Sequence, residues 1–325
     1  MLKNALVTFA TIIVLVLIGS GSWPFPNFGT TDSGMPESII IRTTIQELAG
    51  LIYIAEDGGF FSQNGLRVTI ANSDTGLECV KGMASGEAEI AASAEYPVVG
   101  LILKQENISL IGSIDKYQGQ YIVGRKDRGI GQAGDLVRKK IGVARGTSTE
   151  FYLSRFLYLN NISPQDTTFV NVKPSQFADS IENGSVDAII VPQVYLTPVE
   201  KRLGGNAIIW QAQNNQNAFG VLTCRKEWIA SHPETINKLL RSLVQAENYG
   251  LSHPLESKAI LQKRLNYTDE YMADVWPQNY FSLTLDQSLI AAMEDEARWM
   301  IANNLTAEKI VPDFTDYTFT KALRK

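Results

Sequence analysis

The 325-residue sequence has very few of the residues that usually bind metals, form disulfides or contact nucleic acids. It has two histidines, His232 and His253, and two cysteines, Cys79 and Cys224, none with the spacing of a metal site. The 29 Lys and Arg against 34 Asp and Glu give a net charge of −5, without any basic run. The sequence therefore predicts no metal, no cofactor and no nucleic-acid partner. Both cysteines lie in apolar patterns that favour buried thiols, although a disulfide is permitted outside the cytoplasm.

Long apolar runs are also scarce, and the one that is present lies at the N-terminus. Lys3 precedes an apolar stretch over residues 5–18, and small residues follow it. This pattern is typical of a secretory signal peptide over 1–22, with an uncleaved membrane anchor as the alternative. The Pro-, Gly- and Ser-rich residues 23–37 predict a linker. We therefore expect the chain to be extracytoplasmic, either secreted or tethered to the membrane by its N-terminal segment.

The rest of the chain alternates between short apolar runs and amphipathic segments. At this length, two or three domains are expected. Strand–helix–strand order predicts parallel strands with right-handed crossovers, and hence an α/β fold. The scheme occurs twice, which predicts two similar lobes, and a helical part follows. The expected strands are 38–42, 66–71, 88–92, 108–114, 120–124, 141–144, 168–172, 186–191 and 217–224, with a short helix near 134–138, and the C-terminal helices are 234–250, 255–264, 268–277 and 285–303.

The stretch IGVARGTSTEFYLSRFLYL (141–159) combines a strand, a turn at Gly146 and an amphipathic helix from Thr147. Backbone N–H groups, hydroxyl groups and the positive end of the helix dipole meet at the helix start, which predicts a site for a small anion. Thr147 and Glu150 also fit a capping box. Such a box leaves the N–H groups of Ser148 and Thr149 free, so the two interpretations are compatible.

Four segments in this order resemble one family: IIIRTTIQELAGLIYIAEDGGFFSQNGLRVTI, GEAEIA, KKIGVARGTSTEFYLSRFL and GSVDAIIVP. They are similar to the solute-binding proteins of ABC importers, in the branch that takes nitrate, sulfonates and taurine. They also resemble the NMT1/THI5-like pyrimidine-precursor proteins. The likeness spans roughly 38–310. The family often has Asp-Pro after the last segment, whereas this chain has Gln193 there.

The resemblance implies a two-lobed type II periplasmic-binding-protein fold of the α/β class, with a ligand cleft between the lobes and a helical C-terminal part. We expect lobe 1 over 38–122 plus 223–325 and lobe 2 over 123–222, with crossing strands near 120–125 and 218–224. The lobes would close on the ligand by a hinge motion. The family default is a monomer that delivers a small molecule to an ABC permease in the membrane.

Carried over position by position, the resemblance places the candidate ligand-binding residues at the ends of strands. Hydroxyl and amide groups suit a small polar ligand because they satisfy its oxygens without a buried counter-charge. Glu95 would either meet an amine or cap a helix, and Arg42 and Arg145 would either pair with an anion or lie on the surface. The candidates are Thr43, Thr44, Gln46, Ser93, Ala94, Glu95, Gly146, Thr147, Ser148, Thr149, Pro192 and Gln193, with Tyr195 behind them.

The sequence therefore predicts an extracytoplasmic solute-binding protein of an ABC importer that captures a small polar or anionic compound. The alternatives are a binding protein for a thiamine pyrimidine precursor and a membrane-anchored ligand-sensing protein. The related enzymes that make a thiamine pyrimidine need a histidine and a metal-binding cysteine cluster. Here His232 and His253 both precede prolines in the helical part, and no cysteine cluster is present. No enzymatic activity is predicted.

Overall fold

The computed structural model describes residues 35–214 and 216–319. The predicted signal peptide or anchor (1–22) lies outside the described residues, as does the predicted linker up to residue 34. Among the helices that are described, none has the length and apolar character needed to cross a membrane.

The first sheet has six strands in the order β11-β4-β10-β3-β1-β2. Strand β1 is parallel to β2 and β3, as the strand–helix–strand order predicted, whereas β10 is antiparallel to β3 and β4. Strand β10 returns from a distant part of the chain and is almost completely buried at the centre of the sheet. The strands are β1 (Glu37–Thr43), β2 (Leu66–Asn72), β3 (Ile90–Ala94), β4 (Ile108–Tyr117), β10 (Ala218–Arg225) and β11 (Asn279–Tyr280).

The second sheet has five strands in the order β7-β6-β8-β5-β9. Strand β6 is parallel to β7 and β8, and β5 is antiparallel to β8 and β9. The half-buried edge strand β9, with the sequence AIIWQ, was not among the predicted strands. The strands are β5 (Gln120–Arg125), β6 (Lys140–Val143), β7 (Thr168–Asn171), β8 (Ala188–Pro192) and β9 (Ala207–Gln211).

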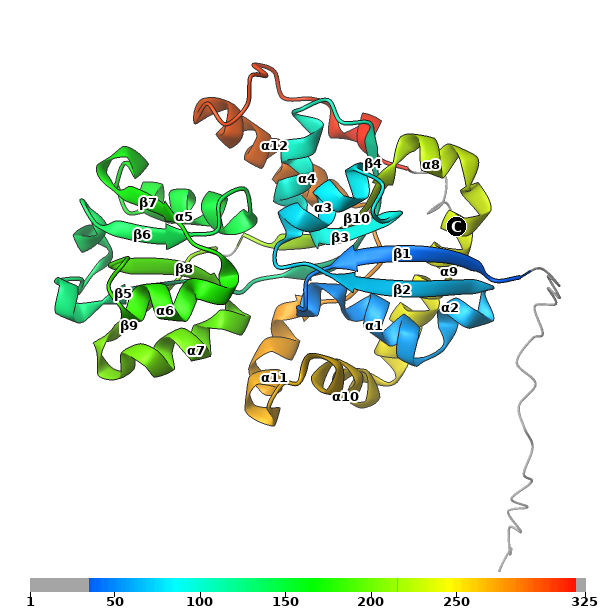
Figure 1. Cartoon of the computed structure of the whole chain (residues 1–325), viewed down its shortest axis with the longest axis horizontal. Helices are drawn as coiled ribbons and strands as arrows, with labels where there is room; N and C mark the ends of the chain where they lie inside the picture. The colour runs from blue at the N-terminus through cyan, green and yellow to red at the C-terminus, as the bar shows by residue number, and fades with distance from the viewer. Residues whose placement is uncertain (1–34, 215, 320–325) are drawn as a thin grey trace, which may run out of the picture. The chain divides into compact units, whose positions relative to one another are not determined.

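Helices connect the strands and form the C-terminal part (Figure 1). Those between strands of the first sheet are α1 (Gly50–Asp57), α2 (Phe60–Gln63), α3 (Gly76–Ala84) and α4 (Glu95–Ile102). Those of the second sheet are α5 (Ser148–Leu159), α6 (Phe177–Glu182) and α7 (Gln193–Leu203), with a 3-10 turn at Ala133–Leu136 where a short helix was expected. After β10 come α8 (Lys226–Ser231), α9 (Pro233–Ser252), α10 (Pro254–Leu265), α11 (Asp269–Val275) and α12 (Gln287–Ala302).

The C-terminal helices complete the core of the first sheet. In α9, Ile236, Leu239, Leu240 and Leu243 recur at helical spacing, and all are buried in one cluster with Leu51 of α1. The tryptophans Trp228, Trp276 and Trp299 pack against the hydrophobic clusters. Cys79 and Cys224 are both buried and free, which confirms the prediction of two thiols.

The chain passes twice between the two sheets. It leaves the first sheet after Tyr117 and enters the second at Gln120, and it leaves the second after Gln211 and returns at Ala218. The expected crossing strands therefore each lie within one sheet, β5 in the second and β10 in the first. The connections between the sheets are the short segments that precede these strands. The lobe boundaries given above stay a prediction.

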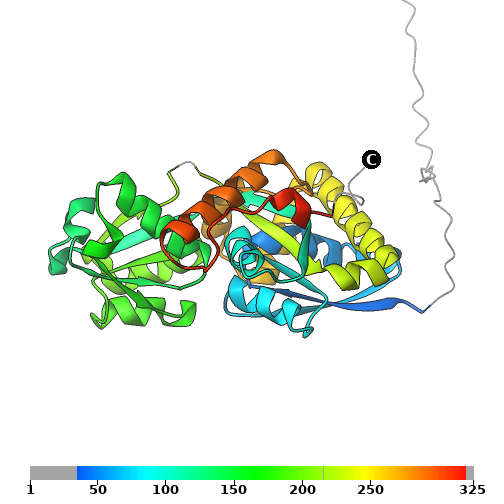
Figure 2. The same ribbon diagram turned by 90° about the horizontal axis from the view of Figure 1, so that it is seen from above.

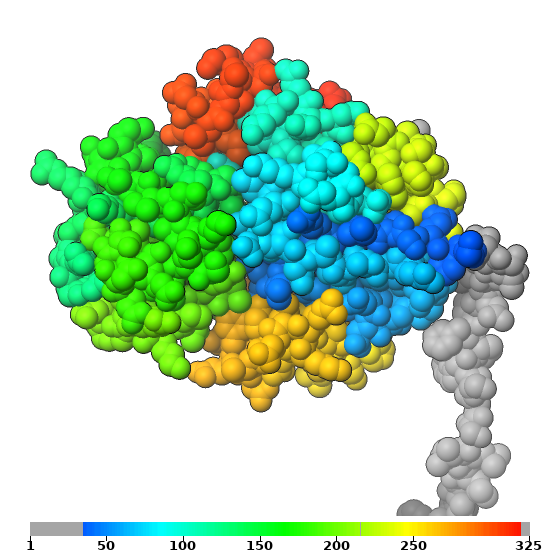
Figure 3. Space-filling model, in the orientation of Figure 1, coloured from blue at the N-terminus to red at the C-terminus, as the bar shows by residue number. Residues whose placement is uncertain are grey.

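The second sheet and its helices lie beside the first sheet in both ribbon views (Figures 1 and 2). In the space-filling view, residues around the second sheet, drawn in green, meet residues of the first sheet and its helices, drawn in lighter blue and cyan, along one seam (Figure 3). The carboxyl ends of the parallel strands in both sheets lead to this seam, so it is the place where a ligand is expected in such folds.

Candidate ligand-binding cleft

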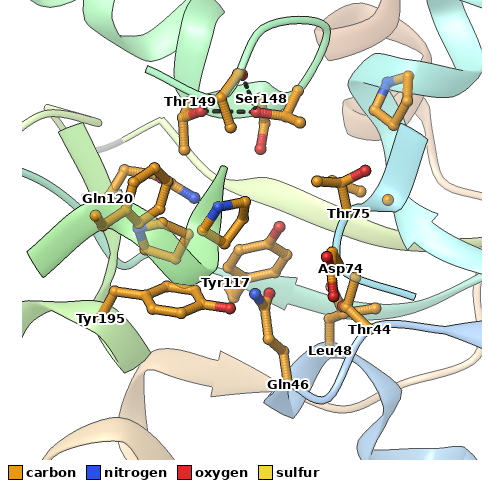
Figure 4. Close-up of a pocket in the computed structure, with 18 residues that line it drawn as sticks. Thr44, Gln46, Leu48, Asp74, Thr75, Tyr117, Gln120, Ser148, Thr149 and Tyr195 are labelled. Carbon is orange, nitrogen blue, oxygen red and sulfur yellow. Dashed lines mark hydrogen bonds between the residues drawn. The ribbon is translucent and has the colours of Figure 1, made fainter. Parts of the chain in front are cut away.

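A cleft with about 530 Å³ of open space, part of it continuous with solvent, lies where the strands of the two sheets end (Figure 4). Tyr117 and Gln120, which flank the first connection between the sheets, form part of its lining. The other lining residues are Thr44, Gln46, Leu48, Asp74, Thr75, Gly76, Ala94 and Pro97 on the side of the first sheet, and Ala144, Thr147, Ser148, Thr149, Pro174, Phe177, Pro192 and Tyr195 on the side of the second.

The cleft brings together many of the residues singled out from the sequence. Those that line it are Thr44, Gln46, Ala94, Thr147, Ser148, Thr149 and Pro192. Tyr195, expected behind Pro192, lies in the lining itself, and its hydroxyl points toward the Gln46 side chain (Figure 4). Residues that follow strands of different sheets are therefore close neighbours across the cleft.

The remaining candidates, Thr43, Ser93, Glu95, Gly146 and Gln193, do not belong to the lining. The Thr43 and Ser93 hydroxyls donate to the carbonyls of the next residue within the buried strand ends. Because side chains alternate along a strand, each of these lies on the opposite face from its cleft-lining neighbour. The N–H of Gln193 donates to the Gly119 carbonyl (2.8 Å), which places it against the connection between the sheets.

At the start of α5 the predicted capping box is wrong. The Thr147 hydroxyl donates to the Ala144 carbonyl (2.7 Å) and contacts the Thr149 hydroxyl (2.6 Å) instead of accepting the N–H of Glu150. The Glu150 carboxylate accepts the N–H of Gly146 (2.8 Å) instead of that of Thr147. Gly146 has a φ of +74°, and this left-handed turn brings its own N–H within reach of Glu150. The first N–H groups of α5 are left without intrahelical acceptors beside the cleft.

The start of α3 forms a similar cap on the opposite side. Thr75 accepts the N–H of Glu78 (3.2 Å), as in a capping box, but the Glu78 carboxylate accepts the N–H of Asp74 (3.1 Å). Asp74, Thr75 and Gly76 all line the cleft and were not among the candidates. The sequence could have revealed these three residues, because they follow β2 in the same way that the predicted residues follow the other parallel strands.

Tyr117, Gln120, Pro174 and Phe177 are further lining residues that were not predicted. Pro174 and Phe177 follow β7, so the rule used for the other strands would also have found them. Tyr117 and Gln120 depend on where the chain crosses between the sheets, which the sequence placed a few residues too late.

The electrostatic character of the cleft comes from backbone dipoles more than from side-chain charges. Among the described residues that line the cleft, Asp74 is the single charged one, and none is Lys, Arg or His. The lining contains first residues or N-caps of α3, α4, α5, α6 and α7, so the positive ends of these helices face the same space. Such an arrangement holds a small anion with N–H groups and hydroxyls.

The two arginines considered for anion binding lie outside the cleft lining. Arg42 pairs with Glu87 and donates to the Ser73 hydroxyl (2.7 Å). Arg145 pairs with Glu150, and its guanidinium lies 5.1 Å from the Phe169 ring centroid. Both are engaged on the outside of the strand ends, as in the surface interpretation.

Comparison with known proteins gives the family. The model of the NMT1/THI5-like family matches residues 48–257, which is more than half of the chain. The chain belongs to this family. The putative aliphatic sulfonates-binding protein of Bacillus subtilis (strain 168) is 24% identical over 328 residues, covering 98% of this chain and 96% of the relative.

Solved structures show the same fold for this NMT1/THI5-like chain. The alkanesulfonate-binding protein SsuA of Xanthomonas axonopodis pv. citri, bound to MOPS, has a TM-score of 0.75 at 15% identity, covering 88% of this chain and 99% of that one. The desulfurization enzyme DSZB in complex with biphenyl-2-sulfinic acid has a TM-score of 0.67 at 16% identity, covering 89% and 98%. The two-lobed periplasmic-binding-protein fold predicted from the sequence is confirmed.

In this NMT1/THI5-like chain a pair of buried carboxyls lies behind the cleft. Glu95, between the lining residues Ala94 and Pro97, accepts the N–H of Phe219 (3.0 Å) and neither caps α4 nor reaches the cleft. Burial raises the pKa of Glu95 to about 8. Burial and the charge of Glu95 raise the pKa of Glu296 of α12 well above its ordinary value. Within the described residues, neither Glu296 oxygen has a hydrogen-bond partner. Both groups are therefore held in the neutral form at neutral pH.

This pair predicts a stability that falls as pH rises. In the unfolded chain a glutamic acid side chain ionises at about pH 4.3. Between that pH and about 8 the unfolded chain holds fewer protons at Glu95 than the folded chain does, so the free energy of unfolding falls as pH rises, by roughly 1 kcal/mol per pH unit. Glu296 acts in the same direction, because its pKa is raised as well. We expect Glu95→Gln and Glu296→Gln each to flatten the dependence, measured by urea unfolding at pH 5.5, 6.5 and 7.5. The exposed Glu270→Gln is the control, and a wild-type slope in both buried variants would contradict the assignment.

Proposed function

We propose that this chain is an extracytoplasmic solute-binding protein of an ABC importer. It captures a small anionic or zwitterionic compound of the nitrate, sulfonate and taurine class in the cleft and delivers it to a membrane permease. The observation that carries the proposal is the convergence of helix starts and hydroxyls on a cleft whose lining includes no cationic side chain. The full-length similarity to a putative aliphatic sulfonates-binding protein supports the ligand class.

The polar groups of the cleft suit the oxygens of a sulfonate or a similar anion. Within the described residues the Ser148 hydroxyl has no hydrogen-bond partner, while the hydroxyls of Thr147 and Thr149 bond to each other. Burial raises the pKa of Tyr117 well above its ordinary value, so its phenol stays protonated and can donate. Donors that carry no charge hold an anion and avoid the cost of burying an ion pair.

Asp74 favours a ligand that carries a positive group as well. Its carboxylate is the single charge in the lining, and burial together with this carboxylate raises the pKa of the lining Tyr195. An ammonium group near Asp74 and the aromatic rings of Tyr117, Phe177 and Tyr195 would be stabilised by charge and by cation–π attraction. We therefore propose an aminosulfonate such as taurine ahead of a simple alkanesulfonate.

The chain performs no chemistry on its ligand in this proposal, although a desulfurization enzyme shares its fold. No Cys or His is present among the lining residues that the structure describes. Burial raises the pKa of Cys79 and of Cys224 to about 12, so neither thiol supplies a thiolate at neutral pH. In the described part of the chain, no group of three or more His, Cys, Asp or Glu is arranged to hold a metal ion.

The ligand class is tested by thermal unfolding of residues 35–325 with nitrate, bicarbonate, sulfate, taurine, alkanesulfonates, MOPS and thiamine pyrimidine precursors. A ligand at 100 times its Kd adds about 2.7 kcal/mol, or roughly 5 °C for a protein of this size. We expect the largest shift with taurine. Asp74→Asn should reduce that shift and increase the shift with ethanesulfonate, because it removes a charge that attracts the ammonium group and repels a plain anion. If ethanesulfonate gives a larger shift than taurine in both the wild-type protein and Asp74→Asn, Asp74 has no role in selecting zwitterions.

The start of α5 is tested by two substitutions on neighbouring residues. Ser148→Ala should weaken ligand binding by about 1–2 kcal/mol through loss of one hydrogen bond to the anion, with folding almost unchanged. Thr147→Val, which removes a hydroxyl already bonded to Ala144, should lower the melting temperature and affect binding less. Calorimetric titration and thermal unfolding separate the two effects. Equal stability loss in both variants, with unchanged binding, would assign Ser148 a purely structural role.

Closure of the cleft is tested at Gly146, which faces Leu77 of α3 from the side of the second sheet. A Cβ at Gly146 would lie 2.8 Å from Leu77 Cδ2, whereas one at Gly86 would meet nothing within 4 Å, and both glycines have positive φ. Gly146→Ala and Gly86→Ala should therefore share a backbone cost of about 1–2 kcal/mol, but only Gly146→Ala should weaken binding and reduce the ligand-induced contraction seen by small-angle scattering. Adding Leu77→Ala should restore both. Unimpaired contraction in Gly146→Ala would show that closure does not need this contact.

A further inference from the structure

The two connections between the sheets are joined to each other by one buried side chain. Gln213 lies in the second connection, between β9 and β10, and is fully buried. Its Oε1 accepts the N–H groups of Gly119 and Gln120 (2.9 Å to the latter) in the first connection. Its Nε2 donates to the carbonyls of Tyr117 (3.3 Å) and Gln216 (3.1 Å). All four hydrogen-bonding positions of the amide are thus occupied.

These bonds reach both sides of the first connection. Tyr117 is the last residue of β4 in the first sheet, and Gln120 is the first residue of β5 in the second. Gly119 between them has a φ of +148°, which disfavours other residues. A rotation of one sheet relative to the other needs backbone changes in this segment. Any such rotation must stretch the hydrogen bonds that Gln213 makes to Tyr117 and Gln120.

Gln213 is linked to the cleft through the backbone of two lining residues, to which it is hydrogen-bonded. Tyr117 and Gln120 line the cleft, whereas Gln213 does not. A second side-chain bridge joins the two connections. Gln118 Nε2 donates to Asn217 Oδ1 (3.0 Å), and both side chains are half-buried.

Two further hydrogen bonds join the same connections, from the Ala212 N–H to the Gln120 carbonyl (2.7 Å) and from Gln211 Nε2 to Gln118 Oε1 (3.4 Å). Among these links, Gln213 is the one whose fully buried side chain holds two lining residues while it does not itself belong to the lining.

We propose that Gln213 is a positioning residue that sets the angle between the two lobes and, through it, ligand affinity. Its hydrogen bonds favour the arrangement in which the cleft residues of both sheets face each other. Without them the lobes sample wider angles, and the smaller competent fraction lowers the apparent affinity. The effect on the angle is independent of any ligand, while the effect on affinity rests on the proposed function.

The test uses spin labels at Lys201→Cys on α7 and Lys263→Cys on α10, both exposed positions, in a chain whose native cysteines are buried. Pulsed electron paramagnetic resonance gives the distance distribution in the ligand-free protein. We expect Gln213→Met to broaden this distribution and to raise the Kd for MOPS, or for the compound that gives the largest thermal shift, about tenfold. Gln287→Met, which replaces an exposed glutamine at the start of α12, should change neither quantity.

A folded Gln213→Met protein with the wild-type distance distribution overturns the proposal, whatever its melting temperature, because a space-filling role changes stability alone. If Gln213→Met does not fold, Gln213→Asn takes its place, because its shorter amide cannot make all four hydrogen bonds at once: a broader distribution supports the role of Gln213, and an unchanged one overturns it. If no compound binds the wild-type protein, the ligand class fails, but the distances in the ligand-free protein still decide the role of Gln213.

Discussion

The site depends on one constraint, namely that the described chain crosses between its two sheets at only two places, which lie side by side. Residues 120–211 build the second sheet between these crossings, and the first sheet is made from both sides of them. Because the parallel strands of both sheets end at the same seam, their following helices begin there. The donors of the cleft are thus a consequence of topology: α3 and α5 lie on opposite sheets, and their N-caps Thr75 and Thr147 line one space.

This topology also explains how a cleft can attract an anion with no cationic side chain in its lining. Helix dipoles supply partial positive charge, and the carboxyls that lie closest behind them must not cancel it. Glu95 follows the lining residue Ala94 directly, so an ionised Glu95 would place a negative charge just behind the site. Burial against α12 holds it neutral at neutral pH. The burial of Glu95 that lowers stability at high pH therefore also preserves the positive electrostatic potential of the cleft.

Local sequence was sufficient for the elements and for much of the lining, since strand, turn and helix follow from periodicity and caps. It was insufficient wherever side-chain direction or turn geometry decided the outcome. Thr75 and Thr147 each precede a glutamate three residues on, yet only Thr75 accepts the N–H of that glutamate, because Gly146 turns the chain before α5. Thr43 and Ser93 were one position from the cleft, and strand alternation put them on the wrong face. Asp74 was missed although the rule that found Ser148 also applied to it.

The residues that no local pattern could reveal are those at the crossings. Gln213 has an ordinary polar neighbourhood, QAQNNQN, which predicts an exposed loop. It is nevertheless completely buried, because its amide meets the backbone of a segment more than 90 positions earlier. Such a long-range match appears only once both crossings are in place. A polar residue in a loop can therefore be as constrained as an apolar residue in the core, and here it is the crossings, not the cleft, that impose the constraint.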